Sequence, residues 1–432
     1  MTIYDEAMQM KEELVACRRD LHAHPELAWT EFRTASHVAK SLKALGYEVL
    51  MGDACMKADE MMGVPDKAEL SRAMGRAIKE GADQELVKKM EGGKTGVVGI
   101  MHFAKPGKTV GLRFDMDCLL VEENPTDAHR PTRDGFASTH PGLMHACGHD
   151  GHTAIGLGVA RLIAAHKDEM AGTVKLCFQP GEEGVMGARG MVASGIVDDV
   201  DYFLSGHIGL GNGENNSLVC MTEGFLATSK IDAFFTGKPA HAGANPQNGR
   251  NALLAAAQAS LALHTISRHS DGPSRINVGI LKAGTGRNVI PDNAVIKFET
   301  RGGSTAINEF MEGEARRMIK AAADMYGVTV KMVARGSAAS GNSSPDMGEE
   351  VYEVVKGLGV YSDIEKNHTV SGSEDCSYFM SRVQDHGGKA VYMLYGTEEA
   401  SGHHTSEFDF NEDVLPLSVY TVTELVKHFT NK

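Results

Sequence analysis

Short apolar runs of strand length recur along this 432-residue chain, and helical stretches separate some of them. An amphipathic stretch at residues 152–166, for example, lies between two of these runs. Strands that alternate with helices predict an α/β fold, here a mixed sheet with helices on both faces. The runs are residues 109–114, 173–178, 202–205 and 389–394.

The middle of the chain follows a different order, namely strand, helix, strand, strand, helix, strand. This order is that of a ferredoxin-like α+β domain. We therefore expect residues 227–336 to form a domain inserted between two parts of a larger one, residues 1–226 and 337–432. Residues 53–93, rich in Met, Lys, Glu and Asp, read as a further insertion in the first part. The expected elements of the inserted domain are strands 231–236, 276–281, 294–300 and 329–333 and helices 250–269 and 306–326.

The charge balance and the cysteines narrow the class of protein. The chain has 43 Lys and Arg against 57 Asp and Glu, a net charge of -14, which argues against nucleic acid or an anionic membrane as partner. No apolar run approaches the ~20 residues of a membrane span, and the first residues lack the apolar core of a secretory signal. The seven cysteines are odd in number and widely spaced, so we expect reduced thiols in the cytoplasm.

Polar residues cluster just after the predicted strands of the larger domain. Ligands bind at the carboxyl ends of strands in open α/β sheets, and thiol, imidazole and carboxylate groups are transition-metal ligands. Each cluster alone has an ordinary explanation: a buried thiol in a turn, a solvated acidic face or a hydrogen-bonded core histidine. Their coincidence after four different strands favours a metal site. The residues concerned are Asp115, Asp117, Cys147, His149, Glu182, Glu183, His207, His403 and His404.

Seven motifs, in this order, give the chain a specific resemblance. In these motifs the chain resembles the aminoacylase-like branch of the M20 family of metallopeptidases and amidohydrolases. They are RFDMD at 113–117, MHACGHDGHT at 144–153, QPGEE at 179–183, SGH at 205–207, KPAHA at 238–242, NVIPD at 288–292 and SGSED at 371–375.

The resemblance implies a site for two divalent metal ions, zinc or manganese. Cys147 would stand where most of the family has a bridging Asp. A thiolate can also bridge two ions, so Cys147 could take over that role. His403 and His404 are hard to separate as the last ligand, and the spacing to Phe408 favours His404. The implied ligands are Cys147, His149, Glu183, His207 and His404.

The remaining implied roles concern catalysis and substrate binding. Glu182 would be the general base, and Asp117 would orient the ligands. His241 would reach into the active site of a partner chain to stabilise the oxyanion, although an ordinary surface histidine in a glycine-rich loop is the alternative. The resemblance also implies that the inserted domain serves for dimerisation and as a lid. The implied substrate-binding residues are Asn288, Arg301 and Gly372; for Arg301 the alternative is a surface pair with a neighbouring acid.

Taken together, these features predict a metal-dependent amidohydrolase that acts on a small amide, an N-acyl or N-aroyl amino acid. In the insertion at residues 53–93 and the sequence HHTSEF at 403–408 the chain resembles the members of the family that cleave p-aminobenzoyl-glutamate, and this resemblance implies that compound or a similar glutamate conjugate as the substrate. The alternatives are a dipeptidase, a general N-acyl-amino-acid hydrolase or a non-catalytic metal-binding subunit. The spare carboxylate of Glu182 argues against the last. We expect a homodimer, with a second related subunit left open.

Overall fold

The computed structural model describes residues 1–210 and 213–432 and separates into two compact units. The second unit begins at Gly224 and its main part ends at Gly341, where the sequence suggested 227 and 336. It also includes Ser371–Glu374, because the backbone N–H of Leu226 donates to the carbonyl of Gly372 at 2.9 Å. The first unit is Met1–Glu223, Asn342–Val370 and Asp375–Lys432.

The first unit is built on an eight-stranded sheet in the order β1-β2-β4-β3-β5-β12-β6-β11. The sheet is mixed, as predicted. The central strands β4, β3, β5 and β12 are parallel, whereas β2 and β6 run antiparallel to their neighbours β4 and β12. The carboxyl ends of the central strands therefore meet at one edge. The strands are β1 (Glu48–Met51), β2 (Val97–His102), β3 (Lys105–Asp115), β4 (Ala171–Gln179), β5 (Tyr202–Ile208), β6 (Ser217–Glu223), β11 (Asp363–Thr369) and β12 (Lys389–Gly396).

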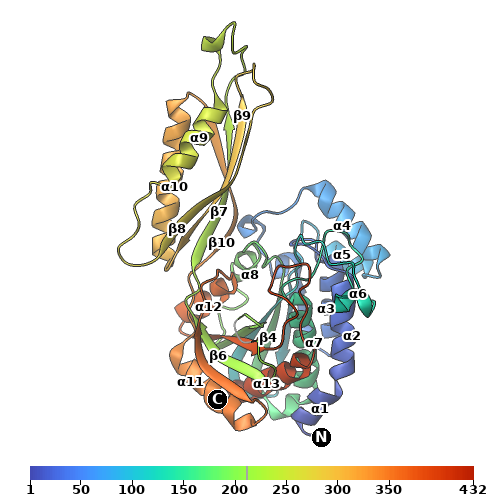
Figure 1. Cartoon of the computed structure of the whole chain (residues 1–432). Coiled ribbons are helices and arrows are strands. Elements are labelled where there is room, and N and C mark those ends of the chain that lie inside the picture. The colour runs from blue at the N-terminus through green and yellow to red at the C-terminus, as the bar shows by residue number, and fades with distance from the viewer. Residues whose placement is uncertain (211–212) are drawn as a thin grey trace. The chain divides into compact units, whose positions relative to one another are not determined.

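Helices cover both faces of this sheet (Figure 1). Successive residues of a strand point to opposite faces, and in β5 the ring of Tyr202 packs 4.7 Å from Phe429 while that of Phe203 stacks 5.6 Å from Phe379. Phe429 belongs to α13 and Phe379 to α12, so the two helices lie on opposite faces. Among the described residues, no helix combines the length and the hydropathy needed to cross a membrane. The longer helices are α2 (Lys11–Ala23), α3 (Phe32–Ala44), α7 (His149–Ala165), α11 (Pro345–Leu358), α12 (Cys376–Asp385) and α13 (Val414–Thr430), with the short α1 (Ile3–Gln9), α6 (Arg130–Arg133) and α8 (Ala188–Val192).

The expected insertion folds into two helices, α4 (Lys67–Lys79) and α5 (Gln84–Lys89), that pack against α3. Pro65 precedes α4, and the side chain of Asp66 caps it by accepting the backbone N–H of Glu69 at 2.9 Å. The insertion is therefore an ordered part of the first unit.

The second unit has the predicted ferredoxin-like order, with the antiparallel sheet β10-β7-β9-β8. In β9 the residues Ile296, Phe298 and Thr300 are buried toward the helices, while the alternating Glu299 and Arg301 lie on the open face. That open face is polar. The elements are β7 (Ala227–Thr236), α9 (Ala252–Leu263), β8 (Ser274–Ala283), β9 (Asn293–Gly302), α10 (Thr305–Met325) and β10 (Thr329–Ala338).

Candidate active site

Cys147 and two histidines lie together at the carboxyl edge of the large sheet. Cys147 lies in the turn before α7, His149 is the first residue of that helix, and His207 lies in β5. Their ligand atoms are all within 4.8 Å of one another. The Sγ of Cys147 is 3.5 Å from Nε2 of His207, and the bond lengths of tetrahedral zinc place a sulfur and a nitrogen ligand about 3.6 Å apart. The spacing therefore suits two ligands of one ion.

The hydrogen bonds of both rings turn Nε2 toward the thiol. His149 donates from Nδ1 to the carbonyl of Asp117 at 2.9 Å, and His207 donates from Nδ1 to the carbonyl of Ile208 at 2.7 Å. Burial holds the pKa of His207 well below its usual value, so Nε2 of that ring keeps its lone pair for a metal. Burial alone would also lower the pKa of His149, but the Asp115 carboxylate, 3.7 Å from Nε2, raises it above its usual value. A positive charge is therefore favoured at Nε2 of His149, which in the described part of the chain has no hydrogen-bond partner.

A second group shares the same thiol. The ligand atoms of Cys147, Glu183 and His404 also lie within 4.8 Å of one another, and Nε2 of His404 is 3.7 Å from Oε1 of Glu183. Burial raises the pKa of Glu183 to about 7, and Oε1 of Glu183 is buried with no hydrogen-bond partner among the described residues. His403 is also close, with Nδ1 3.5 Å from the thiol, but its Nε2 pairs with Glu399 at 2.8 Å. Sulfur, nitrogen and oxygen donors of this kind fit transition metals, and two of the buried atoms, Nε2 of His149 and Oε1 of Glu183, have no hydrogen-bond partner in the described part of the chain. Cys147 belongs to both groups.

Asp117 holds the acidic pair in place. Its carboxylate accepts the backbone N–H of Glu182 at 3.0 Å and that of Glu183 at 2.9 Å. The turn after β4 is also fixed by Glu31, which accepts the N–H of Gly181 at 2.8 Å. Oε2 of Glu182 lies 3.9 Å from Nε2 of His149. The carboxylate of Glu182 thus lies close to the donor cluster, next to that of Glu183.

The sequence places Asp115 among the polar residues of the predicted metal site but gives it no specific role, and it gives His152 none, although both lie inside the motifs. Nδ1 of His152 lies 2.5 Å from Asp115, and its Nε2 accepts the backbone N–H of Ile208 at 2.9 Å. Both ring nitrogens of His152 are therefore used, which leaves neither for a metal. Burial alone would raise the pKa of Asp115, but His149 and Arg113 hold it well below its usual value. We infer that Asp115 supplies negative charge behind His149.

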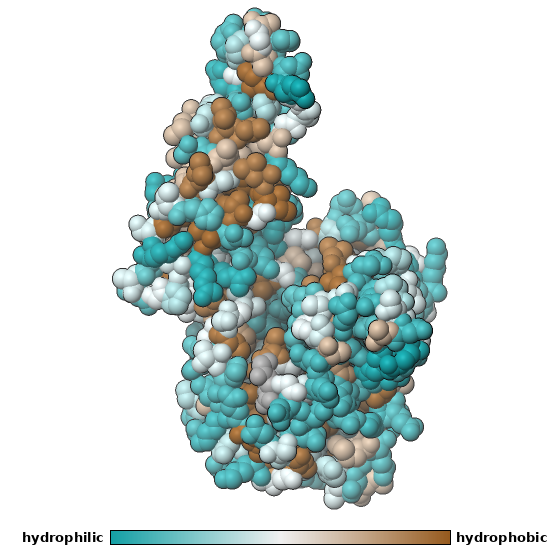
Figure 2. Space-filling model, in the orientation of Figure 1, coloured by the Kyte–Doolittle hydropathy of each residue, from teal (hydrophilic) through white to brown (hydrophobic). Residues whose placement is uncertain are grey.

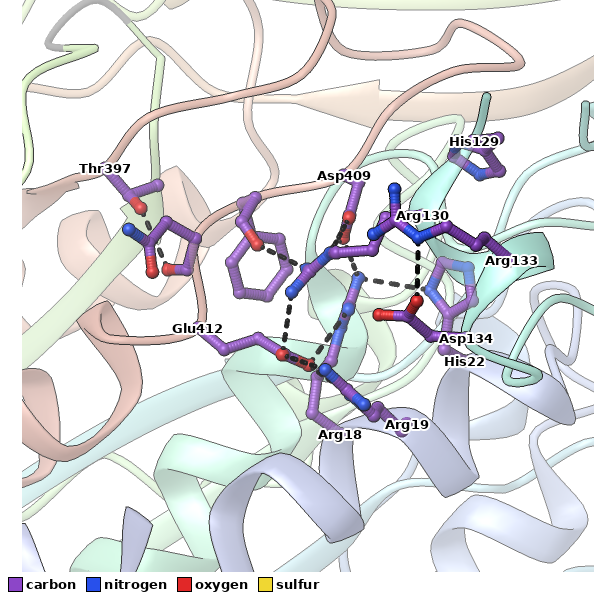
Figure 3. Close-up of polar contacts among 12 residues, drawn as sticks. Arg18, Arg19, His22, His129, Arg130, Arg133, Asp134, Thr397, Asp409 and Glu412 are labelled. Carbon is purple, nitrogen blue, oxygen red and sulfur yellow. Dashed lines mark hydrogen bonds and ion pairs between the residues drawn. The ribbon is translucent and has the colours of Figure 1, made fainter. Parts of the chain in front are cut away.

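A buried network of ion pairs centres on Arg18, and Figure 3 shows its contacts with Asp409 and Glu412. The Arg18 guanidinium, fully buried, contacts Asp150 at 2.8 Å, Asp409 at 3.0 Å and Glu412 at 3.2 Å. It therefore ties α2 to the first turn of α7, next to His149, and to the segment that follows His404. Nothing local in the sequence indicates this network.

The site residues expected in the inserted domain lie in the second unit. His241 is exposed, and its Nδ1 accepts the backbone N–H groups of Gly243 and Ala244. The carbonyl of Asn288 accepts the N–H of Ala242 at 3.0 Å, so the loops of His241 and Asn288 adjoin each other.

Arg301 lies near the other end of β9, at the carboxyl end of that strand, and pairs with Glu299 at 2.9 Å. This pair is the alternative that the sequence left open for Arg301. Gly372 belongs to the short second segment of the second unit.

An apolar pocket of about 360 Å³ in the first unit borders Glu183. The insertion contributes Pro65 and Glu69 to its wall. Its volume lies in the usual range of small-molecule sites, and its apolar walls suit an aromatic or aliphatic group. The apolar side chains that line it are Leu27, Ala28, Pro65, Cys118, Leu119, Leu120 and Met186.

Comparison with known proteins identifies relatives along almost the whole chain. Residues 111–428 match the model of peptidase family M20/M25/M40. The chain is 48% identical over 422 residues to indole-3-acetyl-aspartic acid hydrolase of Enterobacter agglomerans, covering 98% of this chain and 97% of that one. It is 47% identical over 413 residues to one subunit of p-aminobenzoyl-glutamate hydrolase of Escherichia coli (strain K12), covering 95% and 94%. The crystal structure of an aminobenzoyl-glutamate utilization protein from Klebsiella pneumoniae has a TM-score of 0.85 and 39% identity, covering 99% and 98%.

Proposed function

The chain belongs to peptidase family M20/M25/M40 and is a hydrolase of amide bonds, and we propose that it cleaves aromatic acyl conjugates of acidic amino acids. The two relatives act, by their names, on an indole-acetyl conjugate of aspartate and on an aminobenzoyl conjugate of glutamate. Both substrates join an aromatic acyl group to a dicarboxylic amino acid. p-Aminobenzoyl-glutamate is therefore the first candidate substrate.

We propose that the donor cluster holds two divalent metal ions, with Cys147 as the shared ligand. His149 and His207 complete one group, and Glu183 and His404 the other, because the ligand atoms of each group lie within 4.8 Å. Such ions, when bound, polarise the scissile carbonyl and lower the pKa of the attacking water. Zinc and manganese are the candidates.

Glu182 then acts as the general base. It accepts a proton from the attacking water and passes it to the leaving nitrogen of the amino acid. Asp117 supports this role by fixing the backbone of Glu182 and Glu183, so that one carboxylate faces the substrate while its neighbour binds metal. A carboxylate engaged as a ligand is a weaker base, which explains the use of two adjacent acids.

The observation that carries the proposal is the apolar pocket beside Glu183, which fits an aromatic acyl group. The test is a panel assayed with metal-reconstituted protein: p-aminobenzoyl-glutamate, indole-3-acetyl-aspartate, N-acetyl-glutamate and a dipeptide. We expect the two aromatic conjugates to have the highest kcat/KM. Preference for the dipeptide would support the alternative, a dipeptidase.

We also propose that the active site is shared by two copies of the chain. A strand rise of about 3.3 Å per residue places Asn293, the first residue of β9, roughly 26 Å from Arg301, eight residues later. Asn288 lies past the Asn293 end of β9, in a segment that continues the antiparallel pairing with residues 240–242. This distance exceeds the length of a small acyl amino acid. If both residues bind one substrate, they come from different chains.

The second unit has a surface suited to such pairing. β8 is an edge strand of its sheet, and edge strands are commonly covered or paired. Four exposed apolar residues lie on β8 and on the helix α9 that contacts it, and Figure 2 shows apolar surface on this unit. A two-fold axis at this edge would bury the same patch on both chains. The residues are Leu254, Leu261, Ile280 and Leu281.

Mixing two inactive variants, His241→Ala and Glu182→Gln, is expected to restore activity. In a mixed dimer with shared sites, one site keeps both residues intact, because each comes from a different chain. Activity should approach a quarter of wild type after random subunit exchange, since half of the dimers are mixed and each has one intact site. Hydrolysis by the mixture, compared with each variant alone, is the measurement. Continued inactivity, with exchange shown by differently tagged subunits, would mean that His241 acts within its own chain or has no role.

A further inference from the structure

Two arginines face each other across neighbouring strands of the second unit. Arg275 in β8 pairs in register with Arg301 in β9. Like charges in directly opposite positions destabilise a sheet, so the fold alone does not explain this pair. Arg301 is partly neutralised by Glu299, whereas the Arg275 side chain forms no ion pair with any of the described residues.

Arg275 and Arg301 both line one pocket of about 520 Å³, together with Glu299 of the open face. A third arginine, Arg268, lines the pocket as well. The lining thus has three arginines and one acidic residue, Glu299. Guanidinium groups bind carboxylates through two parallel hydrogen bonds. The pocket therefore has the composition of a site for an anion with more than one carboxylate.

The charge of the second unit supports this interpretation. The unit carries 14 Lys and Arg against 9 Asp and Glu, although the whole chain has 43 against 57. The arginine pocket is thus part of a basic unit in an acidic protein. An anionic ligand would be drawn to this unit and repelled by the rest of the chain.

We propose that Arg275 and Arg301 together bind the two carboxylates of the acidic amino acid in the substrate, and that Arg275 is the specificity residue for the side-chain carboxylate. This inference rests on the proposed function. Directly opposite residues in an antiparallel pair have Cβ atoms about 4.5–5.5 Å apart, a separation that matches two carboxylates joined through a short carbon chain. Arg301 serves the α-carboxylate, which every acyl amino acid has, and Arg275 serves the second one, which only aspartate and glutamate have.

The test is the Arg275→Gln variant of the full-length, metal-loaded protein, assayed on p-aminobenzoyl-glutamate and on the neutral isostere p-aminobenzoyl-glutamine. A charged hydrogen-bonded contact contributes about 1.5–3 kcal/mol, so we expect KM for the glutamate conjugate to rise about 10–100-fold. We expect kcat, and both constants for the glutamine conjugate, to stay within about threefold. Thermal stability should stay equal or rise, because the opposed charges are removed.

Lys282→Gln is the matched control. Lys282 lies on the same strand and the same open face and loses the same charge, but it does not line the pocket. If both variants weaken the binding of the glutamate conjugate equally, the effect comes from the overall positive charge of the unit, and the proposed contact is wrong. An equal loss on both substrates, or no loss on either, would also overturn it.

A binding experiment separates this inference from the proposed function. Glutarate carries two carboxylates and no amide, so its binding to the intact protein can be followed by calorimetry whether or not hydrolysis occurs. We expect Arg275→Gln to weaken the binding of glutarate at least tenfold and to leave the binding of butyrate unchanged. If wild type cleaves neither conjugate, the proposed function fails, and glutarate binding alone then decides whether the pocket recognises dicarboxylates.

Discussion

Glu182→Gln is expected to lose about 10²–10⁴-fold in kcat while keeping its metal content. Glutamine has the size of glutamate and can keep the backbone bonds from Glu182 and Glu183 to Asp117. It cannot accept a proton from water, so the base is lost and the geometry stays. The measurement is turnover on p-aminobenzoyl-glutamate together with metal analysis of the same sample.

The neighbouring variant Glu183→Gln is the matched comparison. It removes the same charge one residue away, at a carboxylate that we assign to the metal, so we expect loss of metal along with activity. Near-normal kcat in Glu182→Gln would remove Glu182 from the mechanism. Loss of metal in Glu182→Gln would instead make it a ligand.

Arg18→Met is expected to destabilise the first unit by about 3–5 kcal/mol, the usual cost of removing one partner of a buried ion pair. The guanidinium is fully buried among Asp150, Asp409 and Glu412, and its loss leaves these carboxylates without their central counter-charge. Because Asp150 adjoins His149, metal affinity should fall as well. Urea unfolding at neutral pH measures the loss.

Arg19→Met serves as the control, because Arg19 contacts Glu412 alone among these acids and its side chain is 32% exposed. We expect it to cost less than about 1 kcal/mol. Equal effects of the two variants would show that the buried network contributes little to stability.

The pH dependence of stability should reflect the same cluster. Burial alone would raise the pKa of Asp150, but Arg18 and His22 hold it far below its usual value. A carboxyl whose pKa is lowered by folding stabilises the protein above its unfolded pKa of about 3.9, and this contribution is lost as the pH falls. Unfolding curves of wild type and Arg18→Met should therefore converge as the pH falls below about 4.

The sequence allowed much of the large sheet to be predicted because its central strands are buried on both faces. Such strands read as continuous apolar runs, as residues 109–114 do in β3. The edge strand β11 has the sequence DIEKNHT and is largely exposed, so no apolar run indicates it. Its place in the sheet follows from pairing with β6, which sequence patterns do not report.

The residues of the candidate site also fall into those that could be predicted from the sequence and those that could not. Cys147, His149 and Glu183 lie in short motifs, where neighbours in the sequence mark the chemistry. The Arg18 network joins residues from α2, α7 and the segment after His404, and the Arg275–Arg301 pair depends on strand register. Contacts of this kind arise only when distant segments meet, so a local pattern cannot indicate them.

The central claim, that the cluster around Cys147 is a two-metal centre for amide hydrolysis, is tested most directly by metal reconstitution. The chain is stripped with a chelator, zinc or manganese is added back in steps, and the release of glutamate from p-aminobenzoyl-glutamate is followed for wild type and Cys147→Ser. We predict no hydrolysis by the stripped protein, recovery that saturates near two ions per chain, and little recovery in Cys147→Ser. Undiminished hydrolysis by the stripped wild-type protein, or full recovery of Cys147→Ser, would contradict the account.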